Sequence, residues 1–290
     1  MAIRAALVVT SALLVSAAAL AQAPGAWHGG ERPPLKAKDI DGQAQELLLY
    51  AENYRNTRRF GEAEAAAKDA LKLLETRYGP NDRRLVPALT ALGGIYFRQA
   101  RHAEADPYYR RATAIEEKSG GGGDPLEVAK SLQQQAKLLL NSGRATEAVP
   151  LERRALAIYE KAYAGKDWMQ TYYIIAANTE KYAGNYDEAL RLLERASAIA
   201  AKRGPAARAS VDIDVSHVRF QQGRYEEAIV ILRGVIAAYE QKFGRDHQAL
   251  AVPYNEMSNS LRKLGRQQEA DAAKKRVQEL SELNRPAGGR

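Results

Sequence analysis

The side chains that could carry out chemistry are few in this sequence and far apart. The histidines are His28, His102, His217 and His247. No two of them have the spacing of a helical metal-binding pair. Asp212 and Asp214 lie two residues apart, so on a helix they would point in different directions and make a poor general acid and base. These residue types therefore predict neither a metal site nor a carboxylate-based active site.

Glycine-rich and nucleophile motifs lead to the same expectation. Residues 120–123 are four glycines, but no strand precedes them and no Lys-Ser or Lys-Thr pair follows, so they are typical of a flexible linker. The chain has no Cys, which excludes disulfides and thiolate chemistry. We therefore expect no cofactor and no enzymatic activity, and an enzyme ranks last among the function classes.

The first residues, 1–21, have the features of a secretory signal peptide. Arg4 gives the start a positive charge, and residues 5–20 carry none. Ala19 and Ala21 are the small residues that signal peptidase accepts, and Gln22 would then begin the mature chain. The alternative is a retained membrane anchor, but the apolar run is shorter than the roughly twenty residues that span a bilayer. The sequence thus favours a periplasmic or secreted protein with no membrane span after cleavage.

One pattern recurs along nearly all of the remaining chain. A turn residue is followed, after three variable positions, by Glu-Ala. The alanines of these pairs are Ala63, Ala105, Ala148, Ala189, Ala228 and Ala270, at spacings of 42, 43, 41, 39 and 42 residues. A second small residue stands twelve positions earlier, as Ala51, Gly93, Ala136, Ala177, Ser216 and Ser258. Small side chains at both positions let two antiparallel helices cross closely, so each unit is predicted to be a helical hairpin.

The apolar periodicity places the helices within a unit. In the third unit it predicts a first helix over 126–141 and a second over 146–162. Gly and Pro clusters separate the units, and no segment alternates with a period of two, so we expect essentially no strand. The resulting organisation is a signal peptide at 1–21, a flexible linker at 22–38, six repeats at 39–284 and a flexible tail at 285–290.

Two segments carry a resemblance to a known family. Residues 104–112 read EADPYYRRA and residues 147–155 read EAVPLERRA. Both are similar to the E-A-x-P-L-Y-x-R-A motif of tetratricopeptide repeats, in the longer form of about 42 residues found in kinesin light chains. The inter-repeat sequence Gly244-Arg245-Asp246-His247 is also similar to that family's loops. The resemblance covers roughly residues 40–283.

The chain also differs from the family pattern. Glu180 and Arg219 stand where the family usually has an aromatic residue or leucine. Pro107 and Pro150 are expected in the first turn of their helices, where a missing N–H leaves no hydrogen bond unmade. The resemblance implies an all-α fold, a right-handed superhelical solenoid of about six helix-turn-helix hairpins. It implies a binding role and not motor transport, since the chain has no heptad coiled coil.

The resemblance further implies that the first helix of each hairpin lines a concave groove. Among the inward positions of that register, seven are Lys or Arg, eight are Asn or Gln, and only Glu52 is acidic, so the groove is predicted to be basic and amide-rich. The candidate partner-binding residues are Arg55, Asn56, Arg98, Lys130, Gln133, Lys137, Asn141, Asn178, Lys181, Tyr182, His217, Asn255, Asn259, Arg262 and Lys263.

Such a groove suits an extended peptide. Amides can bond a peptide backbone as donors and acceptors, while Lys and Arg bind acidic side chains or a C-terminal carboxylate. Nucleic acid is a rival partner for a chain of net charge +8, but there is no arginine cluster interleaved with aromatic residues. An anionic envelope polymer, a polysaccharide or cell-wall strand, is the stronger alternative. A solvated basic face with no partner also stays open.

Overall fold

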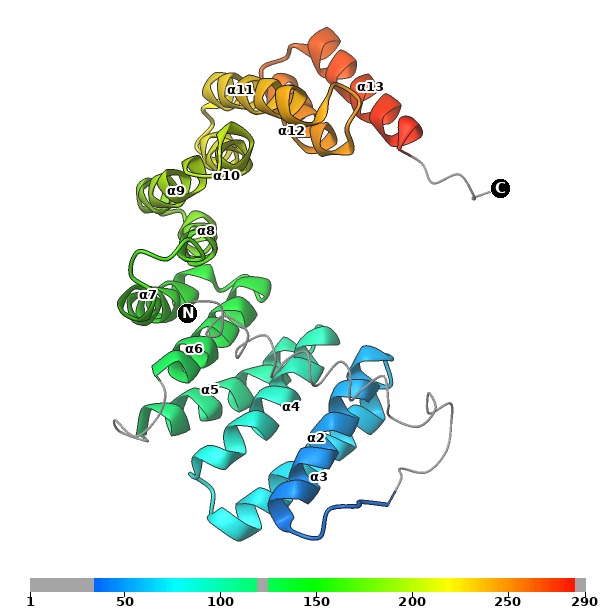
Figure 1. Cartoon of the computed structure of the whole chain (residues 1–290), viewed down its shortest axis with the longest axis vertical. Coiled ribbons are helices and arrows are strands. Elements are labelled where there is room, and N and C mark those ends of the chain that lie inside the picture. The colour runs from blue at the N-terminus through cyan, green and yellow to red at the C-terminus, as the bar shows by residue number, and fades with distance from the viewer. Residues whose placement is uncertain (1–33, 119–124, 285–290) are drawn as a thin grey trace, which may run out of the picture. The chain divides into compact units, whose positions relative to one another are not determined.

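The structure is a computed structural model that describes residues 34–118 and 125–284, and within these ranges it is helical and contains no strand (Figure 1). The α-helices of the described residues are α2 (Ile40–Asn56), α3 (Phe60–Tyr78), α4 (Val86–Arg98), α5 (His102–Lys118), α6 (Pro125–Asn141), α7 (Ala145–Ala162), α8 (Met169–Tyr182), α9 (Tyr186–Ala201), α10 (Pro205–Gln221), α11 (Tyr225–Phe243), α12 (Ala251–Lys263) and α13 (Gln267–Leu283). The all-helical prediction is confirmed. The predicted signal peptide at 1–21, residues 22–33 of the predicted linker and the tail at 285–290 lie outside the described residues.

The helices pair in chain order into six hairpins, which we call units 1 to 6. The first helix of each unit, helix A, is α2, α4, α6, α8, α10 or α12, and helix B is the next helix along the chain. Each helix A packs against its own helix B, and each helix B packs against helix A of the following unit. The helices of unit 3 begin and end within one residue of the predicted bounds. Contacts between consecutive hairpins are the packing of a repeat solenoid.

The small residues lie where the two helices of each unit cross. All six alanines of the Glu-Ala pairs are completely buried, at 0% exposure. The small residues twelve positions earlier are buried as well, in every unit. In unit 6 the Ser258 hydroxyl donates to the Ala270 carbonyl oxygen at 2.8 Å, directly across the crossing. Close approach of two helices at small side chains therefore explains the repeated pattern.

The turn between helix A and helix B has the same backbone in every unit. Gly143, Gly184, Gly223 and Gly265 have φ between 73° and 83°. Units 1 and 2 reach the same left-handed conformation with Arg58 and Ala100, at φ of 60° and 58°. In all units but unit 4, a glutamate near the start of helix B forms an ion pair with the arginine just before that helix, as Glu147 does with Arg144 at 2.6 Å. The turn residue thus ends helix A and reverses the chain.

The expected position of the two prolines is wrong. Helices α5 and α7 begin at His102 and Ala145, so Pro107 and Pro150 are the sixth residues of their helices and not part of the first turn. The helices start early because the Arg-x-x-Glu turn is itself helical from its second residue. Each proline therefore removes one intrahelical hydrogen bond on the exposed side of its helix.

Two connections between units contain a short 3-10 helix, η1 (Arg83–Leu85) before α4 and η2 (Gln248–Leu250) before α12. Their residues correspond, because Leu85 and Leu250 both lie twenty positions before their unit's Glu-Ala alanine and both are fully buried. The capping bonds correspond too. The Asp82 carboxylate accepts from the Arg84 N–H at 2.9 Å, and the His247 imidazole accepts from the Ala249 N–H at 3.1 Å.

Within the two ranges that the structure describes, the helices are too short or too polar for any of them to cross a bilayer. The apolar segment 5–20 is outside these ranges.

Candidate functional site

The predicted groove residues share one register on the A helices, and we call this set of side chains the A-helix face. Successive A helices contact one another directly, α6 with α8, α8 with α10 and α10 with α12. The A helices that carry these side chains therefore adjoin one another from unit 3 to unit 6. The side chains of the face differ in burial and in partners, and these differences decide which of them can meet a ligand.

In unit 1 the polar side chains of the face bind one another. Arg55 forms an ion pair with Glu52 at 2.5 Å, and the Asn56 amide donates to the same carboxylate at 3.1 Å. Arg55 extends toward α4, where a Cβ at Gly94 would lie 3.0 Å from its Nη1. Glycine at that position leaves the space that the guanidinium occupies. The charge of Arg55 is thus largely compensated within its own helix.

The face of units 2 and 3 carries cations beside an aromatic ring. The Lys137 ammonium lies 5.5 Å from the centre of the Phe97 ring, which joins α6 to α4. Lys137 and Arg98 are exposed, and neither has a carboxylate within 4 Å among the described residues. Lys130 is different, because it pairs with Glu127 at 2.6 Å. Asn141 donates to the Lys137 carbonyl oxygen at 2.8 Å and so is bound to its own helix.

Gln133 connects the face to a buried carboxyl group. Its amide donates to Glu152 Oε1 at 3.1 Å, and the Glu152 side chain is only 3% exposed. Burial raises the pKa of Glu152 to about 7, although the Gln133 hydrogen bond opposes this shift. In unit 2 the equivalent position is Tyr109, a core residue. Unit 3 therefore has a buried carboxyl group where unit 2 has a buried phenol ring.

The face of units 4 to 6 balances its charges across helices. Lys181 on α8 donates to Asn178 Oδ1 at 2.8 Å, and burial lowers the pKa of its ammonium group. Asp214 on α10 is half-buried, which raises its pKa, while His217 and Lys181 favour its charged form. His217 Nε2 lies 3.4 Å from Glu256 Oε2 on α12, and this hydrogen bond lowers the pKa of Glu256. Lys181 and His217 thus each interact with an acid on the next A helix.

The remaining candidates lie on α8 and α12. The Tyr182 side chain is 66% exposed, and the Lys181 ammonium lies 4.8 Å from its ring centre. In unit 6 Asn255 accepts from Lys274 Nζ at 3.0 Å, and Asn259 is half-buried. Arg262 and Lys263 are exposed at the last turn of α12. In the described part of the chain these two cations have no acidic partner within 4 Å.

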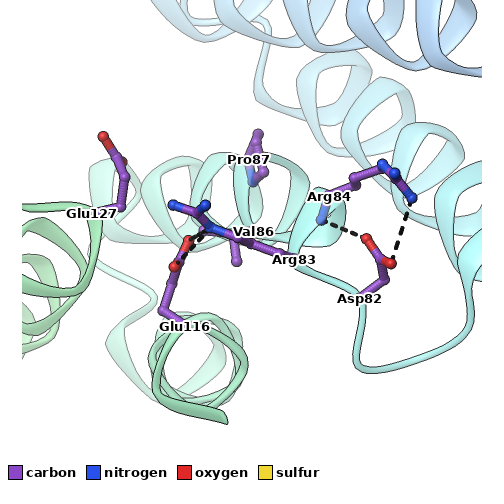
Figure 2. A pocket seen from close by; sticks show the side chains of 7 residues that line it. All are labelled: Asp82, Arg83, Arg84, Val86, Pro87, Glu116 and Glu127. Atoms are coloured by element: carbon purple, nitrogen blue, oxygen red, sulfur yellow. Dashed lines mark hydrogen bonds and ion pairs between the residues drawn. The ribbon is translucent and has the colours of Figure 1, made fainter. Parts of the chain in front are cut away.

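A cavity of about 510 Å³ borders the face between units 2 and 3. It is lined by Asp82, Arg83, Arg84, Val86, Pro87, Glu116 and Glu127 (Figure 2). Pro87 lies six residues before Gly93, the inward position that Lys130 occupies six residues before Ala136 in unit 3. Glu127 is the partner of Lys130. Arg83 bonds to Glu116, while Arg84 pairs with Asp82 at 3.6 Å.

The sequence did not reveal several of these residues. Asp214 and Glu256 lie fourteen positions before their Glu-Ala alanines. The candidates Gln133 and Asn255 lie fifteen positions before theirs, so the two acids come one residue after a position of the chosen register. The available signal was that they are acidic side chains next to a register that is rich in cations and amides. Glu152 and Glu116 could be suspected only because they replace apolar residues of other units. No group of His, Asp or Glu that could hold a metal ion occurs in residues 34–118 and 125–284.

A family model named tetratricopeptide repeat matches residues 43–118, 88–161 and 207–282. A search of curated proteins found no match. Among solved structures, nearly identical repeats of a kinesin light chain from Podosopora anserina are 21% identical, with a TM-score of 0.58, covering 69% of this chain and 97% of that one. BtubC (BKLC) from P. vanneervenii is 16% identical with a TM-score of 0.55, covering 88% and 96%. A Rap protein complexed with competence and sporulation factor is 16% identical with a TM-score of 0.52, covering 85% and 66%.

Proposed function

Because the chain belongs to the tetratricopeptide repeat family, we propose that it is a non-catalytic scaffold that binds an extended segment of a protein partner on its A-helix face. One observation carries this proposal. Of the seven Lys and Arg candidates on the face, only Arg55 and Lys130 have an acidic partner within 4 Å in the described residues. The arginines of the repeat turns, such as Arg101 and Arg266, are paired with glutamates.

Uncompensated cations on one face attract anionic groups from a partner. Exposed Lys137 and Arg98 can meet carboxylates directly, and Asn and Gln side chains can bond a peptide backbone. The face of units 2 and 3 is a stronger attractor than that of units 4 and 5, because Lys181 and His217 already face Asp214 and Glu256. Recognition is therefore expected to centre on α4 and α6.

The test is calorimetric titration with an end-blocked peptide of alternating Glu and Ala. Lys130→Glu with Lys137→Glu should weaken binding strongly without unfolding, since both side chains are exposed. Lys161→Glu with Lys166→Glu is the matched control, because it changes the net charge equally at exposed positions outside the candidate set. Equal loss of affinity in both double variants would contradict recognition by the A-helix face.

Salt dependence separates the peptide from the polymer alternative. Raising salt from 0.1 M to 1 M shortens the Debye length from about 10 Å to about 3 Å, so both ligands should bind less tightly. Polygalacturonate is the polymer probe. A steep salt dependence with polygalacturonate and no binding of the peptide would replace the protein-partner proposal with polymer binding.

We also propose that the protein is exported to the periplasm or secreted, which rests on the signal-peptide pattern of residues 1–21. N-terminal sequencing of the protein from its native host should begin at Gln22. A chain recovered with Met1 or Ala2 at its start would contradict export and would favour nucleic acid as the partner.

A further inference from the structure

The cavity between units 2 and 3 contains an arginine with unused hydrogen-bonding capacity. Arg83 Nε donates to both oxygens of Glu116, at 3.3 and 3.0 Å. Figure 2 shows the two terminal nitrogens of Arg83 on the side of the guanidinium away from Glu116. For these terminal nitrogens the described residues provide no hydrogen-bond acceptor, and the side chain is 38% exposed. Glu116 therefore holds the Arg83 guanidinium through Nε, and the two terminal nitrogens of Arg83 stay available to a ligand.

Glu116 occupies a position that is a core position in other units. It lies eleven residues after its unit's Glu-Ala alanine, and the equivalent residues in units 1, 3, 4 and 5 are Leu74, Tyr159, Ala200 and Tyr239, all buried. The Glu116 side chain is itself only 3% exposed. Burying a carboxylate is costly unless it is paired, so this glutamate requires Arg83 beside it.

The ion pair is not needed to form the turn that carries Arg83. The corresponding turn in unit 6, η2, has Gln248 in place of Arg83 and Ser281 in place of Glu116. It nevertheless forms the same 3-10 helix with the same kind of side-chain cap. Since the backbone is the same without the pair, folding of the turn does not explain why unit 2 has it.

We propose that this cavity binds a carboxylate group, held by the two terminal nitrogens of Arg83. The planar fork of a guanidinium matches a carboxylate with two parallel hydrogen bonds. Val86 and Pro87 form an apolar wall for the carbons attached to that carboxylate. Asp82 and Glu127 also line the cavity, and their negative charges disfavour a doubly charged phosphate relative to a singly charged carboxylate.

The carboxylate could belong to an acidic side chain or to a chain terminus. Pro87 and Lys130 lie next to the cavity and belong to the A-helix face, so a peptide bound there can reach Arg83. The idea that a bound peptide supplies the carboxylate rests on the proposed function, whereas the proposal that the cavity binds a carboxylate does not.

The experiment is an NMR titration of the full chain that follows the backbone amides of Arg84, Glu116 and Glu127. The probes are N-acetylglutamate N-methylamide for a side-chain carboxylate, N-acetylglycine for a terminal one, and N-acetylglutamine N-methylamide as the uncharged control. We expect saturable shifts with at least one carboxylate probe and none with the amide. The carboxylate probe that binds more tightly identifies the source, and either result supports the cavity.

The variants test Arg83 directly. Arg83→Gln with Glu116→Gln removes the fork without leaving an unpaired buried charge, and η2 shows that such a turn folds. Binding should weaken by about tenfold or more, as expected for loss of hydrogen bonds to a charged group. Arg191→Gln with Glu188→Gln is the control, because it removes an ion pair of 2.7 Å that lies outside the cavity and, like the test variant, leaves the net charge unchanged. It should bind the probe as the wild type does.

The proposal is overturned if the wild type shows no saturable shift, if the glutamine probe gives the same shifts, or if the double variant binds as tightly as the wild type. None of these results bears on the Lys130 and Lys137 titration, which tests the A-helix face separately. Circular dichroism of the double variant should show the melting behaviour of the wild type.

Discussion

Units 2 and 3 are neighbours built on the same nine-residue motif, yet they fill their helix crossings differently. In unit 2 the Tyr109 ring packs directly against Gly93, and a Cβ on that glycine would lie 2.8 Å from Tyr109 Cζ. In unit 3 the same two positions are Ala136 and Glu152, and both are buried. A ring against glycine and a carboxyl group beside alanine thus support the same hairpin. The comparison shows that crossings of the same register accept buried side chains of different size and polarity.

The largest expected effect concerns Glu152. Its pKa of about 7 in the folded chain exceeds the ordinary value of 4.5, so the native state holds a proton that the unfolded chain has lost. Stability should therefore fall as the pH rises from about 4.5 to about 7, by about 3 kcal/mol in total at 1.36 kcal/mol per pKa unit. Urea unfolding at pH 5 and pH 8 measures this fall, and Glu152→Gln should remove it. Glu282→Gln, at an exposed position of α13, is the control and should leave the fall intact.

Overpacking the crossing of unit 3 should have the next largest effect. Ala148 is completely buried, so Ala148→Leu must displace α6 from α7 and should cost on the order of 1–3 kcal/mol. Lys166→Leu, in an exposed connection, should cost little. Thermal unfolding of the two variants measures the difference. Equal destabilisation by both would show that the register of the repeat is wrong.

Adding a methyl group to the crossing of unit 2 sharpens the comparison. Gly93→Ala should clash with the Tyr109 ring but gain helix propensity, which offsets part of the loss, so we expect a net destabilisation of about 1 kcal/mol. Combining it with Tyr109→Leu should relieve the clash. Additive losses in a double-mutant cycle, measured by urea unfolding, would mean that the two positions do not interact.

The smallest expected effect distinguishes the turns of the two units. Gly143 has φ of 73°, and Gly143→Ala should cost about 1 kcal/mol because an L-residue is strained there. Ala100 already bears this strain at φ of 58°, so Ala100→Gly should stabilise unit 2 by somewhat less than about 1 kcal/mol, since glycine also loses more chain entropy on folding. Chemical denaturation should give opposite signs for the two variants. The same sign for both would contradict an equivalent turn.

The sequence predicted the architecture because its repeats report on local packing. Alanine recurring at Ala63, Ala105 and the later units marked the crossings, and all of these residues are completely buried. The prolines were misplaced because a helix start depends on whether the turn itself is helical, which spacing alone does not determine. The pairing of Arg83 with Glu116 also could not be predicted, because it joins residues 33 positions apart and departs from the pattern of the other units.

For the candidate site, the sequence identified the cations and amides of one face but not their partners. Lys181 belongs to the same register as Lys137, yet only Lys181 interacts electrostatically with acids on the next A helices. That difference depends on Asp214 and Glu256, which come from other units and from a position next to the chosen register. A register that describes positions within one unit does not show which side chains the A helix of the next unit places beside them.

The contacts of each hairpin with its chain neighbours have a mechanical consequence. Because hairpins pack against adjacent hairpins and not against distant ones in the described residues, tension applied to the ends of the solenoid would pass through the interfaces in series. Each interface would bear the full load, and the weakest would open first while the others stayed closed. Stretched between two anchored partners, such a chain would lengthen in steps, one hairpin at a time.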